Sequence, residues 1–109
     1  MTRVNNVPRG SWNQPHEREH LACLRSYETG DANGRTGGDY TARGTFDGAY
    51  QYIQSTWNSF AEQSGNSRWV GVNPADAPPA VQDAVTWWAL TNGHARDWPN
   101  TYPLCDQRI

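Results

Sequence analysis

Residues 16–28 read HEREHLACLRSYE, and this stretch begins the folded part of the chain. Leu21, Leu24 and Tyr27 recur at three- and four-residue spacing without an intervening Gly or Pro, a pattern that predicts a helix. The next stretch, TGDANGRTGGD at residues 29–39, contains four glycines and predicts a loop, because no regular element tolerates so many.

The rest of the chain divides into short elements. Residues 40–51 place aromatic and Thr residues between turn formers and predict a short β-hairpin. Residues 55–63 predict a two-turn helix, and residues 73–93 predict the strongest helix, with prolines at its start and Gly93 at its end. Residues 94–105 show no regular pattern. We therefore expect a mainly helical α+β fold with one hairpin.

The length of 109 residues suits one domain with a small core. We expect residues 1–15 to form a flexible N-terminal arm, because they show no periodicity, and residues 16–109 to form the domain. Only 36% of the residues are hydrophobic, but six Trp, five Tyr and two Phe supply large side chains for burial. Apolar helix faces predict core positions for Trp57, Phe60, Val85 and Trp88.

Charge and hydropathy argue against two kinds of partner. All nine basic residues are Arg and face eleven acids, so the net charge of −2 gives no electrostatic attraction for nucleic acid. No apolar run approaches the roughly 20 residues that cross a bilayer, and residues 1–20 lack the apolar core of a signal peptide. We expect no nucleic-acid partner and no membrane span, and the export route stays open.

The letters HEREH at residues 16–20 match the zinc-hydrolase pattern H-E-x-x-H, which places two imidazoles one helical turn apart. The extended metalloprotease motif requires Gly and His where this chain has Cys23 and Ser26. Only Glu28 or His94 remains as a third ligand, and the pattern lies in the charged first turn of its helix. We therefore expect a solvated helix start without metal and keep a zinc hydrolase as the less favoured interpretation.

Glu28 ends the first predicted helix just before the Gly-rich loop, where a carboxyl can face a cleft. An acid that protonates a glycosidic oxygen needs a pKa raised by apolar surroundings, and the chain is rich in aromatic residues. A plain helix end is an equal alternative from position alone. Asp47, just before Gly48, is the best-placed second carboxylate and is equally consistent with a turn residue.

Three ordered motifs resemble the transglycosylase-like domain of actinobacterial resuscitation-promoting factors. They are CLRSYETG at residues 23–30, GAYQYIQSTW at residues 48–57 and YPLC at residues 102–105, and the resemblance spans about residues 20–105. It implies a small lysozyme-like fold in which helices and a short hairpin line a cleft for a peptidoglycan strand. The longer run at residues 31–39 departs from the family pattern.

The resemblance also implies roles for individual residues. Glu28 takes the position of the catalytic acid, and Gln51 and Thr56 take positions that line the substrate groove. Cys23 and Cys105 take the positions of a disulfide. Two cysteines near opposite ends of the predicted domain allow one bridge and exclude a four-cysteine metal site.

Further residues are candidates for contact with a saccharide. Tyr40, Tyr50 and Trp98 lie in predicted loop or hairpin segments, where a ring either stacks on a sugar or packs in the core. Gln51 can contact a substrate amide or satisfy backbone groups of the hairpin. Asp47 is a candidate for substrate binding as well as for a turn.

Together these features favour an enzyme that cleaves the β-1,4 bond between N-acetylmuramic acid and N-acetylglucosamine, as a lytic transglycosylase or a lysozyme-type muramidase. Glu28 would act without a cofactor, first as acid and then as base. A non-catalytic peptidoglycan-binding module is the alternative from another class. We expect glycan strands as partners, a monomer or a part of a larger assembly, and an extracytoplasmic location: secreted, in the cell wall or on a phage virion.

Overall fold

Four α-helices and three short 3₁₀ helices make up the part of the chain that the computed structural model describes, residues 15–30 and 37–105. In chain order they are α1 (Pro15–Thr29), α2 (Gln54–Gln63), η3 (Ser67–Trp69), η4 (Pro74–Asp76), α3 (Pro79–Thr91), η5 (Ala95–Asp97) and α4 (Tyr102–Cys105). The predicted arm up to residue 14 and residues 31–36 of the predicted loop lie outside the described residues. The mainly helical architecture expected from the sequence is confirmed.

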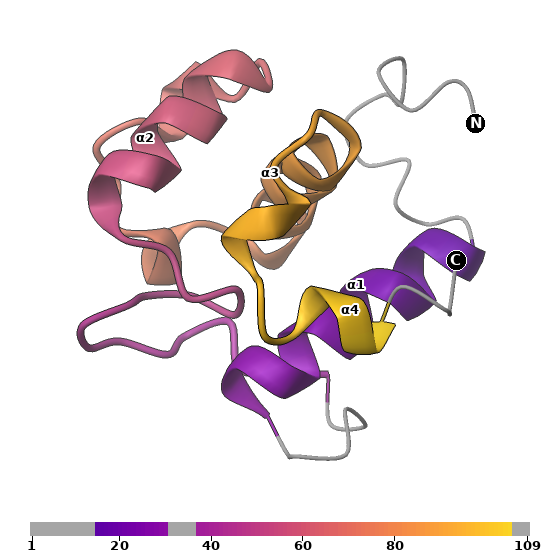
Figure 1. Cartoon of the computed structure of the whole chain (residues 1–109). Helices are drawn as coiled ribbons and strands as arrows, with labels where there is room; N and C mark the ends of the chain where they lie inside the picture. The colour runs from indigo at the N-terminus through magenta and orange to yellow at the C-terminus, as the bar shows by residue number, and fades with distance from the viewer. Residues whose placement is uncertain (1–14, 31–36, 106–109) are drawn as a thin grey trace.

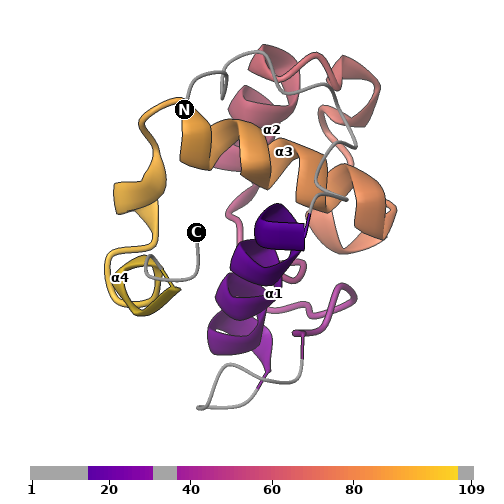
Figure 2. The ribbon, with the colours of Figure 1, turned by 90° about the vertical axis from the view of Figure 1, so that its right-hand side faces the viewer.

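Helix α3 lies between the other two long helices. It contacts both α1 and α2, and α4 contacts α1 (Figure 1). The view in Figure 2 shows that α1 and α3 run in different directions, so they cross rather than pack side by side along their lengths. Among the described residues, no helix is long and apolar enough to cross a membrane.

The three helices predicted from the sequence are confirmed. Those predicted at residues 16–28 and 55–63 are α1 and α2, each slightly longer than expected. The helix predicted within residues 73–93 is α3, which begins only at Pro79. Pro78 is held extended at φ −56° and ψ 149° because a proline follows it, whereas Pro79 fits the first turn, where its missing N–H needs no partner.

The predicted β-hairpin at residues 40–51 is wrong, since the described residues contain no β-strand. One antiparallel bridge joins Asp47 and Tyr52 through two backbone hydrogen bonds of 2.9 Å. Between them the chain turns tightly, with Gly48 at φ 78° and Gln51 at φ 60°. A Cβ atom at Gly48 would lie 2.7 Å from a side-chain oxygen of α3, so this turn requires glycine. The broken alternation of the segment supports only one bridge.

The prediction that residues 94–105 are irregular is also wrong, because they contain η5 and α4. Each element is about one turn long, too short to produce a periodic pattern, and tertiary contacts hold both. Trp98 Nε1 donates a 2.9 Å hydrogen bond to the Tyr50 carbonyl oxygen. The expected disulfide between Cys23 of α1 and Cys105 of α4 is confirmed, with Cα atoms 5.7 Å apart.

An aromatic core fills the space between the helices. The prediction is confirmed for Trp57, Phe60 and Val85, which are buried, whereas Trp88 is half-buried. The ring of Tyr52 lies edge-on to Trp57 and Phe60 at centroid distances of 5.3 and 6.0 Å. Each such pair contributes about 1 kcal/mol beyond the burial of area, so these rings fix the position of the segment that precedes α2.

A buried carboxylate of α3 fixes the loop between α1 and α2. Asp83 Oδ1 accepts hydrogen bonds from Tyr50 Oη at 2.6 Å and Tyr40 Oη at 2.9 Å, and pairs with Arg25 at 3.1 Å. Arg25 Nε also donates to the Gly37 carbonyl oxygen at 2.7 Å. Burial raises the pKa of Asp83, while these donors oppose the shift by favouring the carboxylate. The cluster connects α1 and α3 to the loop between α1 and α2, which carries several of the predicted binding residues.

Two more buried polar side chains of α3 hold the same loop. Gln82 Oε1 accepts a hydrogen bond from the Ala49 N–H at 2.9 Å, and Gln82 Nε2 donates to the Ala77 carbonyl oxygen at 2.9 Å. Thr86 Oγ1 and Tyr52 Oη form a 2.8 Å hydrogen bond. Helix α3 therefore buries polar groups beside its apolar stripe, and these groups fix the backbone path of residues 49–52.

Candidate active site

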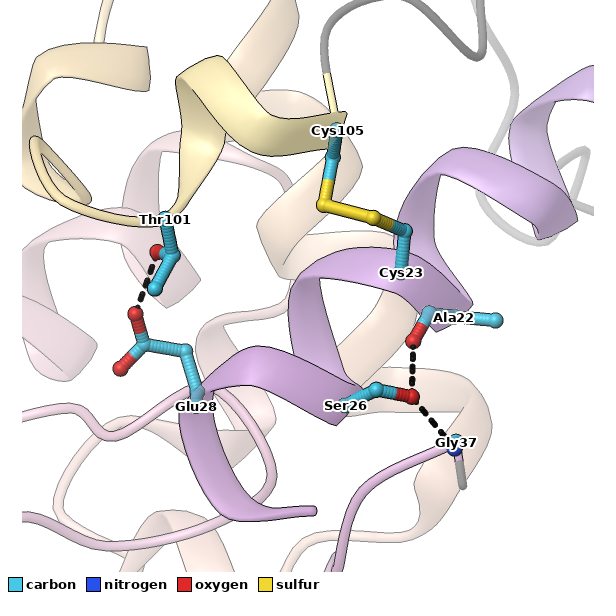
Figure 3. Close-up of a disulfide and its surroundings, with 7 residues drawn as sticks. All are labelled: Ala22, Cys23, Ser26, Glu28, Gly37, Thr101 and Cys105. Carbon is cyan, nitrogen blue, oxygen red and sulfur yellow. Dashed lines mark hydrogen bonds between the residues drawn. A yellow bond between two sulfur atoms is a disulfide. The ribbon is translucent and has the colours of Figure 1, made fainter. Parts of the chain in front are cut away.

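Glu28 lies in the last turn of α1, half-buried and facing the segment that leads into α4. Thr101 Oγ1 donates a 2.5 Å hydrogen bond to Glu28 Oε2, as Figure 3 shows. Burial raises the pKa of the Glu28 carboxyl, and the hydrogen bond from Thr101 opposes part of that shift. The carboxyl therefore keeps its proton to a higher pH than an exposed glutamate does, which is the property required of a general acid.

Two adjoining cavities of about 230 and 270 Å³ form one groove beside Glu28. Glu28 lines the smaller cavity, and Ile53 and Thr56 line the larger one. Residues that line both cavities make the groove continuous: Phe46, Gln51, Asp97 and Trp98. We use the name "groove" for this combined space, with a Glu28 end and a Thr56 end.

The end of α1 is held firmly, so the Glu28 backbone has a defined position. Thr29 Oγ1 donates to the Ala49 carbonyl oxygen at 3.0 Å and accepts from the Asp39 N–H at 2.7 Å. Ser26 Oγ accepts from the Gly37 N–H at 2.5 Å, and the nearby disulfide ties α1 to α4 (Figure 3). The carboxyl is thus positioned by a helix whose final turn is bonded to two other segments.

Three of the residues predicted to bind substrate lie along the groove. Thr56 is in the first turn of α2, and Gln51 occupies the left-handed turn before it, where its Nε2 donates to the Gly48 carbonyl oxygen at 3.1 Å. Trp98 is only 5% exposed, yet its remaining surface lines both cavities. Gln51 and Trp98 share the smaller cavity with Glu28, whereas Thr56 lines only the larger one.

Three other candidates do not line either cavity. Tyr50 is fully buried, with its hydroxyl on Asp83, so its ring belongs to the core. Tyr40 is half-buried, and its hydroxyl donates hydrogen bonds to the same carboxylate. Asp47 Oδ1 accepts a 3.0 Å hydrogen bond from the Gly44 N–H, the contact of a turn residue. The structure thus does not bring these three side chains together with Glu28 in the groove.

Six residues that line the groove were absent from the sequence-based candidates: Phe46, Tyr52, Ile53, Asp97, Pro99 and Asn100. Phe46 keeps 46% of its surface exposed, which is unusual for so large an apolar side chain. In the sequence, the signal that could have pointed to it is an aromatic residue between turn-forming residues. Asp97 ends η5 and is exposed, but its sequence surroundings resemble any polar turn. Only the tertiary structure places Asp97 in the same cavity as Glu28.

The HEREH pattern corresponds to the start of α1. Side chains 16–19 lie outside the described residues, but His20 is fully buried, and its ring lies edge-on to Tyr102 at 5.2 Å. The expectation of a solvated helix start is therefore wrong for His20. Among the residues that the structure describes, no group of three His, Cys, Asp or Glu side chains could hold a metal ion.

Comparison with curated proteins finds relatives that are similar to part of this chain. The chain is similar to the probable transglycosylase SceD of Staphylococcus aureus strains Newman, Mu3 / ATCC 700698 and USA300, with 43% identity over 51 residues in each. The aligned segment covers 47% of this chain and 20% of each relative. No family model and no solved structure matches the chain.

The similarity to SceD supports a transglycosylase-like domain at a coarse level. It concerns about half of this chain and a fifth of the relatives, so their whole activity does not transfer to it. The resemblance to resuscitation-promoting factors stays a prediction. The structure adds the geometry that the similarity lacks: a half-buried carboxyl, its pKa raised by burial, at one end of a groove with exposed apolar and polar side chains.

The contact between Thr101 and Glu28 makes a testable prediction about the site. Thr101→Val keeps the shape of the side chain but removes the hydroxyl that favours the ionised carboxyl, so the pKa of Glu28 should rise further. A ¹³C NMR titration of the Glu28 carboxyl measures the shift. Thr101→Ser retains the donor and serves as the control. A pKa that falls or stays unchanged in Thr101→Val would show that this hydrogen bond does not tune the acid.

Proposed function

We propose that this domain cleaves the β-1,4 bond between N-acetylmuramic acid and N-acetylglucosamine in peptidoglycan, as a lytic transglycosylase with Glu28 as its acid and base. The observation that carries the proposal is the half-buried Glu28 carboxyl, with its raised pKa, at one end of a groove. The similarity to a probable transglycosylase supports the same class of reaction. A lysozyme-like fold is part of this proposal.

In the first step, protonated Glu28 donates its proton to the glycosidic oxygen as the bond to C1 of the muramyl unit breaks. Burial favours the protonated carboxyl before the reaction. Once the proton has left, the Thr101 hydroxyl stabilises the resulting carboxylate through its hydrogen bond to Oε2. The same contact thus supports the ionised form that the second step requires.

In the second step, the Glu28 carboxylate removes the proton of the muramyl 6-hydroxyl, and that oxygen bonds to C1 to give a 1,6-anhydro ring. Glu28 is protonated again at the end, so one carboxyl completes the cycle without water or a cofactor. Gln51 and Thr56, with amide and hydroxyl groups along the groove, are proposed to bind the sugars on either side of the broken bond.

Asp47 is the carboxylate that the sequence offers as the partner of Glu28 in a two-carboxylate hydrolase. A hydrolase of that kind needs a second carboxyl close to the first, across the scissile bond. Asp47 instead accepts a hydrogen bond from the Gly44 N–H and lines neither cavity. Asp47 is therefore not supported as the second carboxyl of such a pair, and Asp47→Asn is proposed to affect stability more than turnover. Asp97 lines the smaller cavity together with Glu28, so the one-carboxylate route is proposed on the similarity to a probable transglycosylase, and the products and the kinetics of the Asp97 variant test it.

Mass spectrometry of muropeptides tests the proposed reaction. Digestion of purified peptidoglycan should release fragments with 1,6-anhydromuramyl ends, which are about 18 Da lighter than hydrolysed ends because no water is added. If the fragments carry only reducing muramic ends, the protein is a lysozyme-type hydrolase and not a transglycosylase. Binding of the polymer without release of soluble fragments would favour a non-catalytic binding module.

The substrate also suggests where the protein works. Peptidoglycan lies outside the cytoplasmic membrane, so we place the domain in an extracytoplasmic setting, secreted, in the cell wall or on a phage virion. The disulfide between Cys23 and Cys105 is consistent with an oxidising compartment. A monomer is sufficient for the mechanism, because all the residues named in it come from one chain.

A further inference from the structure

Asp97 is a second carboxylate in the groove, and the mechanism above gives it no task. It lines both cavities, whereas Glu28 lines only one, so it lies at the junction between the Glu28 end and the Thr56 end. The residue is exposed, and no hydrogen bond or ion pair joins its carboxylate to another described residue. Its oxygen atoms are therefore available to accept hydrogen bonds from a molecule in the groove.

The surroundings of Asp97 combine apolar and polar surface in a way that suits a sugar. Phe46 and Ile53, which are 46% and 45% exposed, line the larger cavity with it. They are two of the four large hydrophobic side chains that the described residues leave exposed, so the groove concentrates this kind of surface. A pyranose presents C–H groups on its faces and hydroxyl or amide donors at its edge, and it can use both kinds of contact at once.

We propose that Asp97 and Phe46 form a saccharide subsite at the centre of the groove, which binds a neutral amino sugar of the N-acetylglucosamine class. The Asp97 carboxylate accepts hydrogen bonds from hydroxyl or acetamido N–H groups, and the Phe46 ring packs against the face of the same sugar. The inference rests on the proposed function for its substrate class. It deepens that function by assigning one residue to recognition rather than to chemistry.

The charge of Asp97 adds selectivity between the two sugars of peptidoglycan. An ionised carboxylate attracts N–H and O–H donors but repels a free lactyl carboxylate of a muramic unit. The subsite therefore favours N-acetylglucosamine over a muramic unit whose lactyl carboxylate is free. In strands with free lactyl carboxylates, in which the two sugars alternate, this preference also determines which bond lies beside Glu28.

Binding of a neutral oligosaccharide to an inactive protein tests this assignment. In Glu28→Gln, the dissociation constant of tetra-N-acetylchitotetraose is measured by calorimetry, with Asp97→Ala, Phe46→Ala or Glu62→Ala added. Asp97→Ala should weaken binding about tenfold or more, as expected for the loss of a charged acceptor, and Phe46→Ala should weaken it too. Glu62 is exposed on α2 and lines neither cavity, so Glu62→Ala should bind like its parent.

Equal affinity in Asp97→Ala and its parent would overturn the subsite, as would a parent that does not bind the oligosaccharide. Kinetics of the active protein give the second readout. Asp97→Ala should raise KM with a smaller change in kcat and leave the anhydro ends of the products unchanged. A loss of kcat as large as that in Glu28→Gln, with unchanged affinity, would also overturn the proposal, because Asp97 would then be catalytic.

These outcomes separate the subsite from the proposed function. If the wild-type protein releases anhydro fragments but the Asp97 variant binds like its parent, the function stands and the subsite fails. If the oligosaccharide binds through Asp97 but peptidoglycan is not cleaved, the subsite stands and the proposed reaction fails.

Discussion

Glu28→Gln is expected to reduce the release of soluble muropeptides by about 10²-fold or more, because glutamine preserves the shape of the side chain but cannot deliver a proton. The amide keeps a side-chain oxygen where Thr101 donates its 2.5 Å hydrogen bond, so the groove should retain its form. Turnover is measured with purified peptidoglycan, and Glu62→Gln on the exposed side of α2 serves as the matched control. Unchanged cleavage by Glu28→Gln would remove Glu28 from the mechanism.

Thermal unfolding of the same variant checks that the loss is chemical. Burial raises the pKa of Glu28 in the folded protein, so folding favours the protonated carboxyl. The contribution of the protonated Glu28 carboxyl to the free energy of unfolding is fully present below the ordinary pKa of Glu. It is lost as the pH rises through the raised pKa of the folded protein. Glu28→Gln has no such proton, so its melting temperature should vary less with pH over that window. A variant that unfolds at the assay temperature would invalidate the comparison of turnover.

Removal of the disulfide should give the largest loss of stability. The Cys23–Cys105 bond joins residues 82 positions apart, for which the chain-entropy model predicts a contribution of about 4.5 kcal/mol. In a domain of this size, Cys23→Ala combined with Cys105→Ala should lower Tm by about 20 °C. Reductant should lower the Tm of the wild-type protein by a similar amount and leave the Tm of the double variant unchanged. A wild-type Tm that does not respond to complete reduction would contradict this prediction.

The disulfide also supports the groove directly. Cys105 ends the segment that contributes Asp97, Trp98 and Thr101 to the groove and to Glu28. Without the bond, that segment is held to α1 mainly by packing and by single hydrogen bonds. We therefore expect the double variant to lose activity even at temperatures well below its melting transition, because the wall opposite Glu28 is no longer fixed.

Local pattern was sufficient to predict the long helices. The three- and four-residue spacing of apolar residues and the prolines before α3 act within a few residues, which is the range that a sequence pattern describes. Two cysteines allowed one bridge, and the family resemblance implied that they pair. The place of Glu28 at a helix end before a Gly-rich loop is a local feature that made it a candidate, and the resemblance gave it the position of the acid, but its burial and its bond to Thr101 are not local.

The segment between α1 and α2 shows where local pattern failed. From the sequence, Tyr40 and Tyr50 could equally stack on a sugar or pack in the core. In the structure both hydroxyls donate to Asp83, a residue of α3 that the apolar stripe did not include. A buried carboxylate with several donors is stable only when residues distant in sequence meet. The same long-range hydrogen bonds explain why the segment forms a loop with one bridge rather than a hairpin.

The carboxylates of the groove depend on tertiary structure most of all. By sequence, Asp47 and Asp97 are both acids in polar turns, and Asp47 has the more suggestive neighbours. The fold places Asp97 in the groove because the disulfide and the hydrogen bond of Trp98 to the loop bring residues 95–101 to the end of α1. Thr101 lies 73 positions from Glu28, and no periodic or local signal can join them. The sequence by itself thus determined the helices, the cysteine pair and the candidate acid, whereas long-range contacts alone decided which side chains share the groove with that acid.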